Sequence, residues 1–186
     1  PEYELFLISS TNSPTRDAAL FRVAECHRMA GNSSAARSAY EKLLSEFKVG
    51  EFASAGAYRL GEILFAEKHF EPAFLQFDLA SSGVSDPEVR LSAAYFAARS
   101  LDALKKDDMA EERYRAVLAA SGTNPYRDNA GIALAALQLR NGKKTYALST
   151  LENLIETTGS TDVGNSAALQ AGALAKELGV VDKALQ

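Results

Sequence analysis

The sequence has 186 residues, of which 47% are hydrophobic and 24% charged, the balance of a folded protein with a sizeable core. Its net charge of -4 argues against a nucleic-acid partner, because phosphate binding requires clustered Lys and Arg side chains. Cys26 is the single cysteine, which excludes an internal disulfide and a Cys-rich metal site, and no stretch is long and apolar enough to span a bilayer.

One residue type recurs along the chain at a fixed spacing of 37 residues: Ala36, Ala73, Ala110, Ala147 and Ala184. Four residues after the alanine stands a large apolar residue, in the order Tyr40, Phe77, Tyr114 and Leu151. Twelve residues before it stands a small residue, in the order Ala24, Gly61, Ala98, Ala135 and Gly172. A fixed period of this length predicts a repeat architecture, whatever the propensity of each segment.

Each unit is predicted to be a hairpin of two amphipathic helices, A and B, because its apolar residues are spaced three and four apart. The first residues carry the helix-B pattern, which places the second helix of a partial leading repeat at 1–10. Full hairpins are expected at 14–47, 51–83, 87–121 and 125–158, and a partial final repeat at 162–186. We expect 1–186 to be a single array and a fragment of a longer one.

The turn inside each hairpin is predicted at one common position, held by Gly31, Gly142 and Gly179 in three units and by Lys68 and Lys105 in two. A helix C-terminus needs the left-handed conformation there, which glycine adopts at low cost. Asp86-Pro87 and Asn124-Pro125 place a capping side chain before a proline suited to a first helical turn. No alternation typical of strands is sustained, so an all-helical chain is expected.

The segment Tyr58–Phe77 resembles the tetratricopeptide repeat family in its Leu60-Gly61 pair, in Ala73 and in Phe77. The resemblance extends over essentially the whole chain and implies an all-α fold, a right-handed α-solenoid of antiparallel hairpins. The unit is longer than the family's roughly 34 residues, and Leu20, Ala57, Ala94, Gly131 and Ala168 stand where the family has a large aromatic residue. Long connections with Pro and Ser are similar to those of bacterial envelope members, which favours the periplasm or cell envelope over the cytoplasm.

The resemblance also implies a concave face, lined by the A helices, that binds a peptide or a helical segment of a protein partner. The expected binding residues lie one, five and eight positions after Leu20 and its equivalents: Phe21, Glu25, Arg28, Tyr58, Glu62, Phe65, Tyr95, Arg99, Asp102 and Ile132. Aromatic anchors beside charges are typical of protein recognition. The alternative interpretation is that these rings only pack between adjacent A helices.

No constellation in the sequence predicts catalysis, a metal or a cofactor. Residues 141–145 lack the leading glycine of a phosphate loop and are expected to form a turn. Asp107, Asp108, Glu111 and Glu112 are expected at the start of a B helix, where the helix dipole favours carboxylates. Cys26 and His27 are adjacent, so their side chains point about 100° apart on a helix and cannot share a metal.

The leading hypothesis is therefore a protein-interaction scaffold that is not an enzyme, does not bind nucleic acid and does not insert into a membrane. One alternative is a regulatory or substrate-presenting arm of an enzyme whose catalytic domain lies outside these residues. Another is a structural spacer that assembles with itself.

Overall fold

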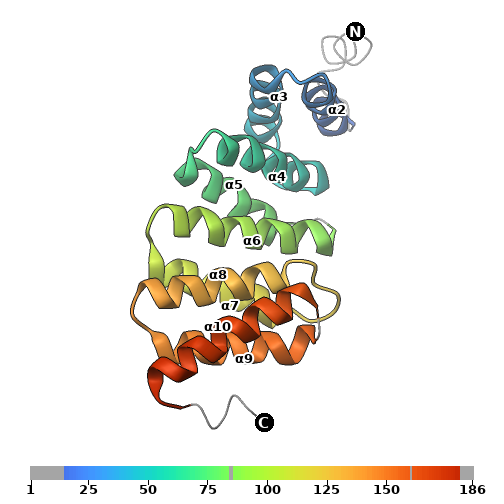
Figure 1. The fold of residues 1–186 in the computed structure, drawn as a ribbon. Helices are drawn as coiled ribbons and strands as arrows, with labels where there is room; N and C mark the ends of the chain where they lie inside the picture. Colours follow the sequence, from blue (N-terminus) through green and yellow to red (C-terminus); the bar gives the residue numbers. More distant parts are fainter. Residues whose placement is uncertain (1–14, 84–85, 160, 181–186) are drawn as a thin grey trace. The chain divides into compact units, whose positions relative to one another are not determined.

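The computed structural model describes residues 15–83, 86–159 and 161–180, and these residues form helices and turns without a strand (Figure 1). The helices are α2 (Arg16–Met29), α3 (Ser33–Glu46), α4 (Glu51–Ala66), α5 (Phe70–Ser82), α6 (Pro87–Ala103), α7 (Asp107–Ala119), α8 (Arg127–Arg140), α9 (Lys144–Thr158) and α10 (Asp162–Leu178). The predicted all-α class is confirmed. The helix predicted at 1–10 and the fifth alanine, Ala184, lie outside the described residues.

The chain divides into two compact units, residues 1–104 with α2 to α6 and residues 105–186 with α7 to α10. We call them unit 1 and unit 2 and describe each by itself. The boundary falls inside the hairpin predicted at 87–121, between α6 and α7. The predicted hairpin bounds and the grouping of the chain into a single array stay predictions.

In unit 1, the residues that recur every 37 positions form the core. Ala36 and Ala73 are fully buried, as are Tyr40 and Phe77 one helical turn later. Gly61 allows α4 to approach α5 closely, because a Cβ atom at this position would lie 2.7 Å from Cε1 of Phe77. The small residue of the repeat is therefore what makes room for the large one.

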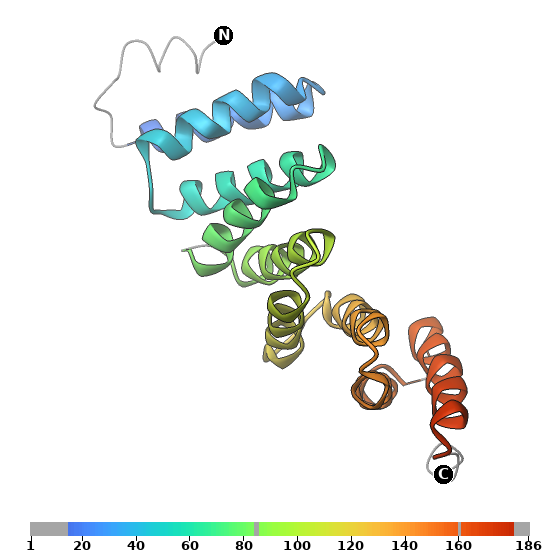
Figure 2. The ribbon, with the colours of Figure 1, turned by 90° about the vertical axis from the view of Figure 1, so that its left-hand side faces the viewer.

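Unit 2 repeats the same packing with fewer rings. Its helices alternate between two rows, α8 and α10 in one and α7 and α9 in the other (Figure 2). Ala110 and Ala147 are fully buried, and Tyr114 and Leu151 are buried beside them. All four repeat alanines in the described residues thus occupy equivalent environments, as the period predicts.

The turns inside the hairpins have the predicted backbone conformation. The φ angle is 76° at Gly31, 71° at Gly142 and 70° at Gly179, and it is also positive at Lys68 (63°) and Lys105 (59°). At the start of α6, the Asp86 carboxylate accepts a 2.8 Å hydrogen bond from the amide N–H of Glu88, with Pro87 as the first helical residue. The turn signal and the cap at Asp86-Pro87 are confirmed. The cap predicted at Asn124-Pro125 is wrong, because α8 begins only at Arg127, after Tyr126, and the Asn124 side chain accepts from the Tyr126 amide in the preceding turn.

Candidate functional site

The predicted binding residues of unit 1 come from its three A helices, α2, α4 and α6, and we call their shared surface the A-helix face. Neighbouring A helices contact each other along this face. The Tyr58 hydroxyl on α4 lies 2.7 Å from the Ser92 hydroxyl on α6, and Arg59 on α4 lies 3.7 Å from Glu25 on α2. The surface is therefore continuous across the three helices.

The aromatic residues of this face are held in place by the core beneath them. The ring centroids of Phe21 and Tyr40 are 6.1 Å apart, and those of Tyr58 and Phe77 are 6.0 Å apart. Phe65 packs edge-on against Phe96 of the next A helix, and Tyr95 is only 8% exposed. Tyr95 is therefore almost completely covered by its neighbours, whereas Phe21, Tyr58 and Phe65 are only partly buried.

Charged side chains lie over the rings and link neighbouring helices. Glu25 pairs with Arg28 at 2.7 Å, and its carboxylate also accepts a hydrogen bond from the Tyr40 hydroxyl. Burial by itself would raise the pKa of Glu25, but the hydrogen bonds from Arg28 and Tyr40 and the charges of Arg28 and Arg59 outweigh it and lower that pKa. Glu25 is therefore ionised at neutral pH and interacts with Arg28, Tyr40 and Arg59.

Two arginines of the face lie on aromatic rings. The Arg59 guanidinium lies 5.5 Å from the Tyr58 ring centroid and donates a 2.8 Å hydrogen bond to Glu62. The Arg99 guanidinium lies 5.3 Å from the Phe65 ring and 6.0 Å from the Tyr95 ring. Arg99 is exposed and has no carboxylate partner among the residues that the structure describes.

The last two predicted residues are Asp102 and Ile132. Asp102 is half-buried on α6, one turn after Arg99. Ile132 belongs to α8 in unit 2 and packs against the core of that unit. Whether Ile132 shares a binding surface with the residues of unit 1 stays a prediction.

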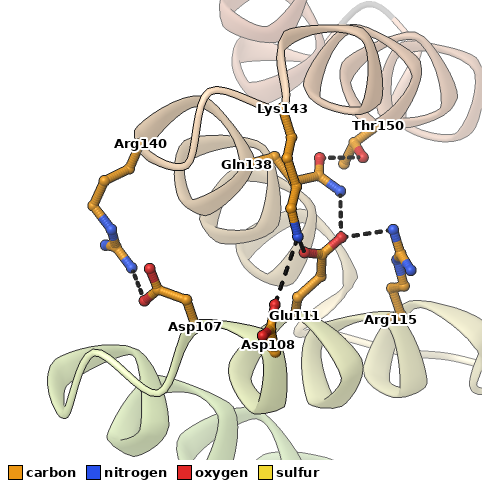
Figure 3. Close-up of polar contacts among 8 residues, drawn as sticks. All are labelled: Asp107, Asp108, Glu111, Arg115, Gln138, Arg140, Lys143 and Thr150. Carbon is orange, nitrogen blue, oxygen red and sulfur yellow. Dashed lines mark hydrogen bonds and ion pairs between the residues drawn. The ribbon is translucent and has the colours of Figure 1, made fainter.

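Unit 2 contains a polar cluster that the sequence did not predict, centred on Glu111 of α7 (Figure 3). Glu111 is 6% exposed, and its carboxylate accepts hydrogen bonds from Arg115 at 2.6 Å and from Lys143 at 2.8 Å. Gln138 on α8, 1% exposed, adds a third donor at 3.2 Å. The Thr150 hydroxyl on α9 donates to Oε1 of Gln138 at 2.8 Å, so the cluster connects three helices.

The electrostatics of this cluster keep Glu111 charged. Burial alone would raise the pKa of the Glu111 carboxyl, but the hydrogen bonds from Lys143 and Gln138 and the charges of Arg115 and Lys143 lower it below its usual value. The hydrogen bond to Glu111 in turn raises the pKa of Lys143. One buried anion is therefore balanced by two cations.

The acidic run of α7 has partners that lie far from it in sequence. Arg140, at the end of α8, donates to Asp107 at 2.6 Å, and Lys143 lies 3.7 Å from Asp108. Both aspartates stand in the first turn of the helix, as predicted from the helix dipole. The predicted turn around Gly142 supplies Lys143, and in the described residues no group of three potential metal ligands comes together.

Beside this cluster, two adjoining pockets open between α7 and α9. The first has a volume of about 280 Å³ and a floor made of Leu118, Gly131, Leu134 and Leu154. One side of it is a stripe of α9 that carries uncharged polar side chains: Tyr146, Ser149, Thr150, Asn153 and Thr157. The second pocket, of about 470 Å³, lies among Asp108, Glu111, Glu112 and Lys143 and shares Arg115 and Tyr146 with the first.

Sequence reasoning missed this region because its side chains come from two B helices, α7 and α9, from the A helix α8 and from the turn before α9, and the binding prediction considered only the A helices. The one available signal was a departure from the repeat. Gln138 stands where the two preceding units have Leu64 and Leu101. A polar side chain at a buried position of a repeat needs hydrogen-bond partners, and neighbouring helices are where these partners lie.

No protein-family model matches the sequence, and no curated protein matches it. Solved structures do match. MamA superposes with a TM-score of 0.71 at 15% identity, covering 93% of this chain and 88% of its own. YrrB, described as a TPR protein with an unusual peptide-binding site, gives 0.69 at 16% identity over 98% of this chain and 88% of its own.

PilF of Pseudomonas aeruginosa superposes with a TM-score of 0.64 at 18% identity, covering 98% of this chain and 80% of its own. At 15–18% identity, the likeness is one of fold. The fold implied by the resemblance is confirmed: the chain has the tetratricopeptide-repeat fold, an all-α solenoid of antiparallel helical hairpins.

Proposed function

We propose that this chain is a protein-interaction module that binds an extended or helical peptide segment on the A-helix face of unit 1. The observation that carries the proposal is Arg99, an exposed guanidinium that lies on two fixed rings without a carboxylate partner among the described residues. The chain is proposed not to be an enzyme and not to bind nucleic acid. No helix in the described residues is long and apolar enough to cross a membrane.

The rings of this face support the proposal by fixing the cation before a partner arrives. A guanidinium lying on an aromatic ring retains its N–H edge for a carboxylate, and the fixed ring limits the side-chain entropy lost on binding. Arg59, 36% exposed at its side chain, offers a second such group, although Glu62 already engages it. The partner segment is therefore expected to carry an acidic side chain that reaches Arg99.

YrrB adds support by analogy, since a protein of this fold is described as having a peptide-binding site. Small repeat units bury their apolar faces against one another, which leaves extended surfaces along the rows of helices. The A-helix face is such a surface in unit 1.

The test uses an array of capped synthetic dodecapeptides that vary the number and spacing of Asp, Leu and Tyr residues. The wild-type chain is compared with the double variant Arg59→Gln/Arg99→Gln. We expect the variant to bind the acidic peptides at least about tenfold more weakly, because hydrogen bonds to charged groups contribute about 1.5–3 kcal/mol.

The matched control is Arg22→Gln/Arg90→Gln, which changes the net charge equally at exposed positions of α2 and α6. Equal loss of binding in the control and in the test variant would mean that only net charge matters. That result would refute a defined site on the A-helix face, as would the absence of any binding peptide. Helicity by circular dichroism verifies that each variant is folded.

A further inference from the structure

We infer that unit 2 holds a second peptide-binding site on its B-helix side, in the pocket between α7 and α9, which takes an aliphatic residue next to an acidic one. This goes beyond the function proposed for unit 1, since the two sites use different helices, α2, α4 and α6 in one and α7, α8 and α9 in the other. The proposal stands on the shape of the pocket, its polar stripe and its single charge.

The floor and the stripe suit an extended backbone. Leu134 and Leu154 give the pocket an aliphatic floor, and Gly131 allows α8 to pack closely on α9 at this floor, because a Cβ atom there would lie 3.1 Å from Cδ1 of Leu154. The stripe runs from Tyr146 to Thr157, which is about 16 Å at 1.5 Å per helical residue. About five residues of an extended peptide have that length.

The stripe also offers hydrogen-bonding groups that the fold does not use. Tyr146 is 61% exposed, Ser149 and Asn153 are exposed as well, and among the described residues none of the three side chains forms a hydrogen bond. Hydroxyl and amide groups can both donate to and accept from a peptide backbone. The backbone N–H and C=O groups of a peptide can replace the water on these exposed groups, whereas a small apolar ligand offers them no hydrogen-bond partner.

The charge of the lining selects an acidic residue. Arg115 is the one charged residue of this pocket, and only one bond from its guanidinium, to Glu111, is made within the described residues. Lys143 is shared between Glu111 and Asp108, so Arg115 is the cation that faces this pocket, and its remaining N–H groups stay available to a ligand. Electrostatic complementarity therefore favours a carboxylate beside the aliphatic side chain.

The corresponding stripe of unit 1 differs at each decisive position. Counting back two periods of 37 residues, Ser149 corresponds to Leu75 and Asn153 to Leu79, both exposed leucines of α5. The residue that corresponds to Arg115 is Asp78 after one period and Glu41 after two. The combination of polar stripe and cation is thus particular to the pocket of unit 2.

The test measures fluorescence anisotropy of labelled, capped octapeptides of Ser and Gly that contain one Leu and one variable residue, Asp, Ser or Lys, one to four positions away. We expect the Asp peptides to bind the wild-type chain best. The variant Asn153→Trp, which fills the pocket from an exposed position, should weaken binding at least about tenfold. Glu156→Trp, at an exposed position of α9 outside the lining, should leave binding unchanged.

A second variant tests the cation. Arg115→Gln should remove the preference for Asp over Ser peptides while retaining weak binding of both, and Arg115→Lys should restore part of the preference. Arg59→Gln/Arg99→Gln should leave these peptides bound as in the wild type, which separates this site from the one proposed on unit 1. A preference for Lys peptides, no binding at all, or equal binding by Asn153→Trp and the wild type would overturn the proposal.

Discussion

The two units place different kinds of side chain at the contact between a B helix and the next A helix. In unit 2, Glu111 and Gln138 meet between α7 and α8. The residues 37 positions earlier, between α5 and α6 of unit 1, are Phe74, which packs against the hydrophobic core, and Leu101, which is fully buried. The same place in the repeat is thus apolar in one unit and polar in the other.

The difference shows that apolar and polar side chains need different surroundings at the same position of the repeat. An apolar pair needs only volume and shape, whereas a buried carboxylate is tolerated when its oxygens are matched by donors. Glu111 has three such donors from two helices and a turn, and Gln138 is in turn bonded by Thr150. Unit 1 therefore depends on ring packing and unit 2 on a connected polar network.

The largest effect is expected from breaking the aromatic core of unit 1. Phe77 is fully buried and stacks on Phe96 with ring centroids 5.4 Å apart. The change Phe77→Ala should lower the free energy of unfolding by about 3–5 kcal/mol, because it removes a large buried ring and leaves a cavity. Urea unfolding followed by circular dichroism measures it, with exposed Leu75→Ala on the same helix as the control.

A cost for Phe77→Ala no greater than that of Leu75→Ala would show that the rings do not support unit 1.

An intermediate effect is expected when the polar network of unit 2 is broken on one side. Glu111→Phe alone should cost about 1–3 kcal/mol, since Gln138 then loses the acceptor of its buried amide. Adding Gln138→Leu recreates the apolar pair of unit 1, and such replacements of buried charges are often neutral or stabilising. Urea unfolding of the wild type, both single variants and the double variant gives the coupling energy.

If the double variant were less stable than either single variant, the two units would not be interchangeable at this position, and the comparison drawn above would be wrong.

The smallest effect is expected on the loss of folding stability at low pH. The pKa of Glu111 is lower in the folded chain than in the unfolded one, so its contribution is complete above the unfolded value and is lost as the pH falls through the folded pKa. Glu111→Gln should therefore flatten the loss of stability below about pH 4, where unfolded Glu titrates. Glu25→Gln should do the same in unit 1.

Thermal unfolding between about pH 2 and pH 7 measures this, with exposed Glu112→Gln as the control on α7. An acid limb as steep in Glu111→Gln as in the control would show that the carboxylate of Glu111 is not stabilised by its neighbours.

Much of the fold could be predicted because the signals that carry it are local or periodic. The recurrence of Ala36, Ala73, Ala110 and Ala147 predicted four equivalent positions, and the structure shows each of them fully buried. The left-handed turn was predicted even at Lys68 and Lys105, where no glycine marks it, because the repeat register fixed the position. Binding at Tyr58 and Arg99 stays a prediction, and the structure adds the rings on which Arg99 lies.

The sequence by itself determined the helical hairpins, their period and their core, because each depends on spacings within one repeat. Only the tertiary structure decided what the charged residues do. Glu111, Gln138 and Lys143 are distant in sequence and come together because α7, α8 and the turn before α9 pack side by side. A pairing across helices depends on side-chain direction and distance, and a linear period contains neither.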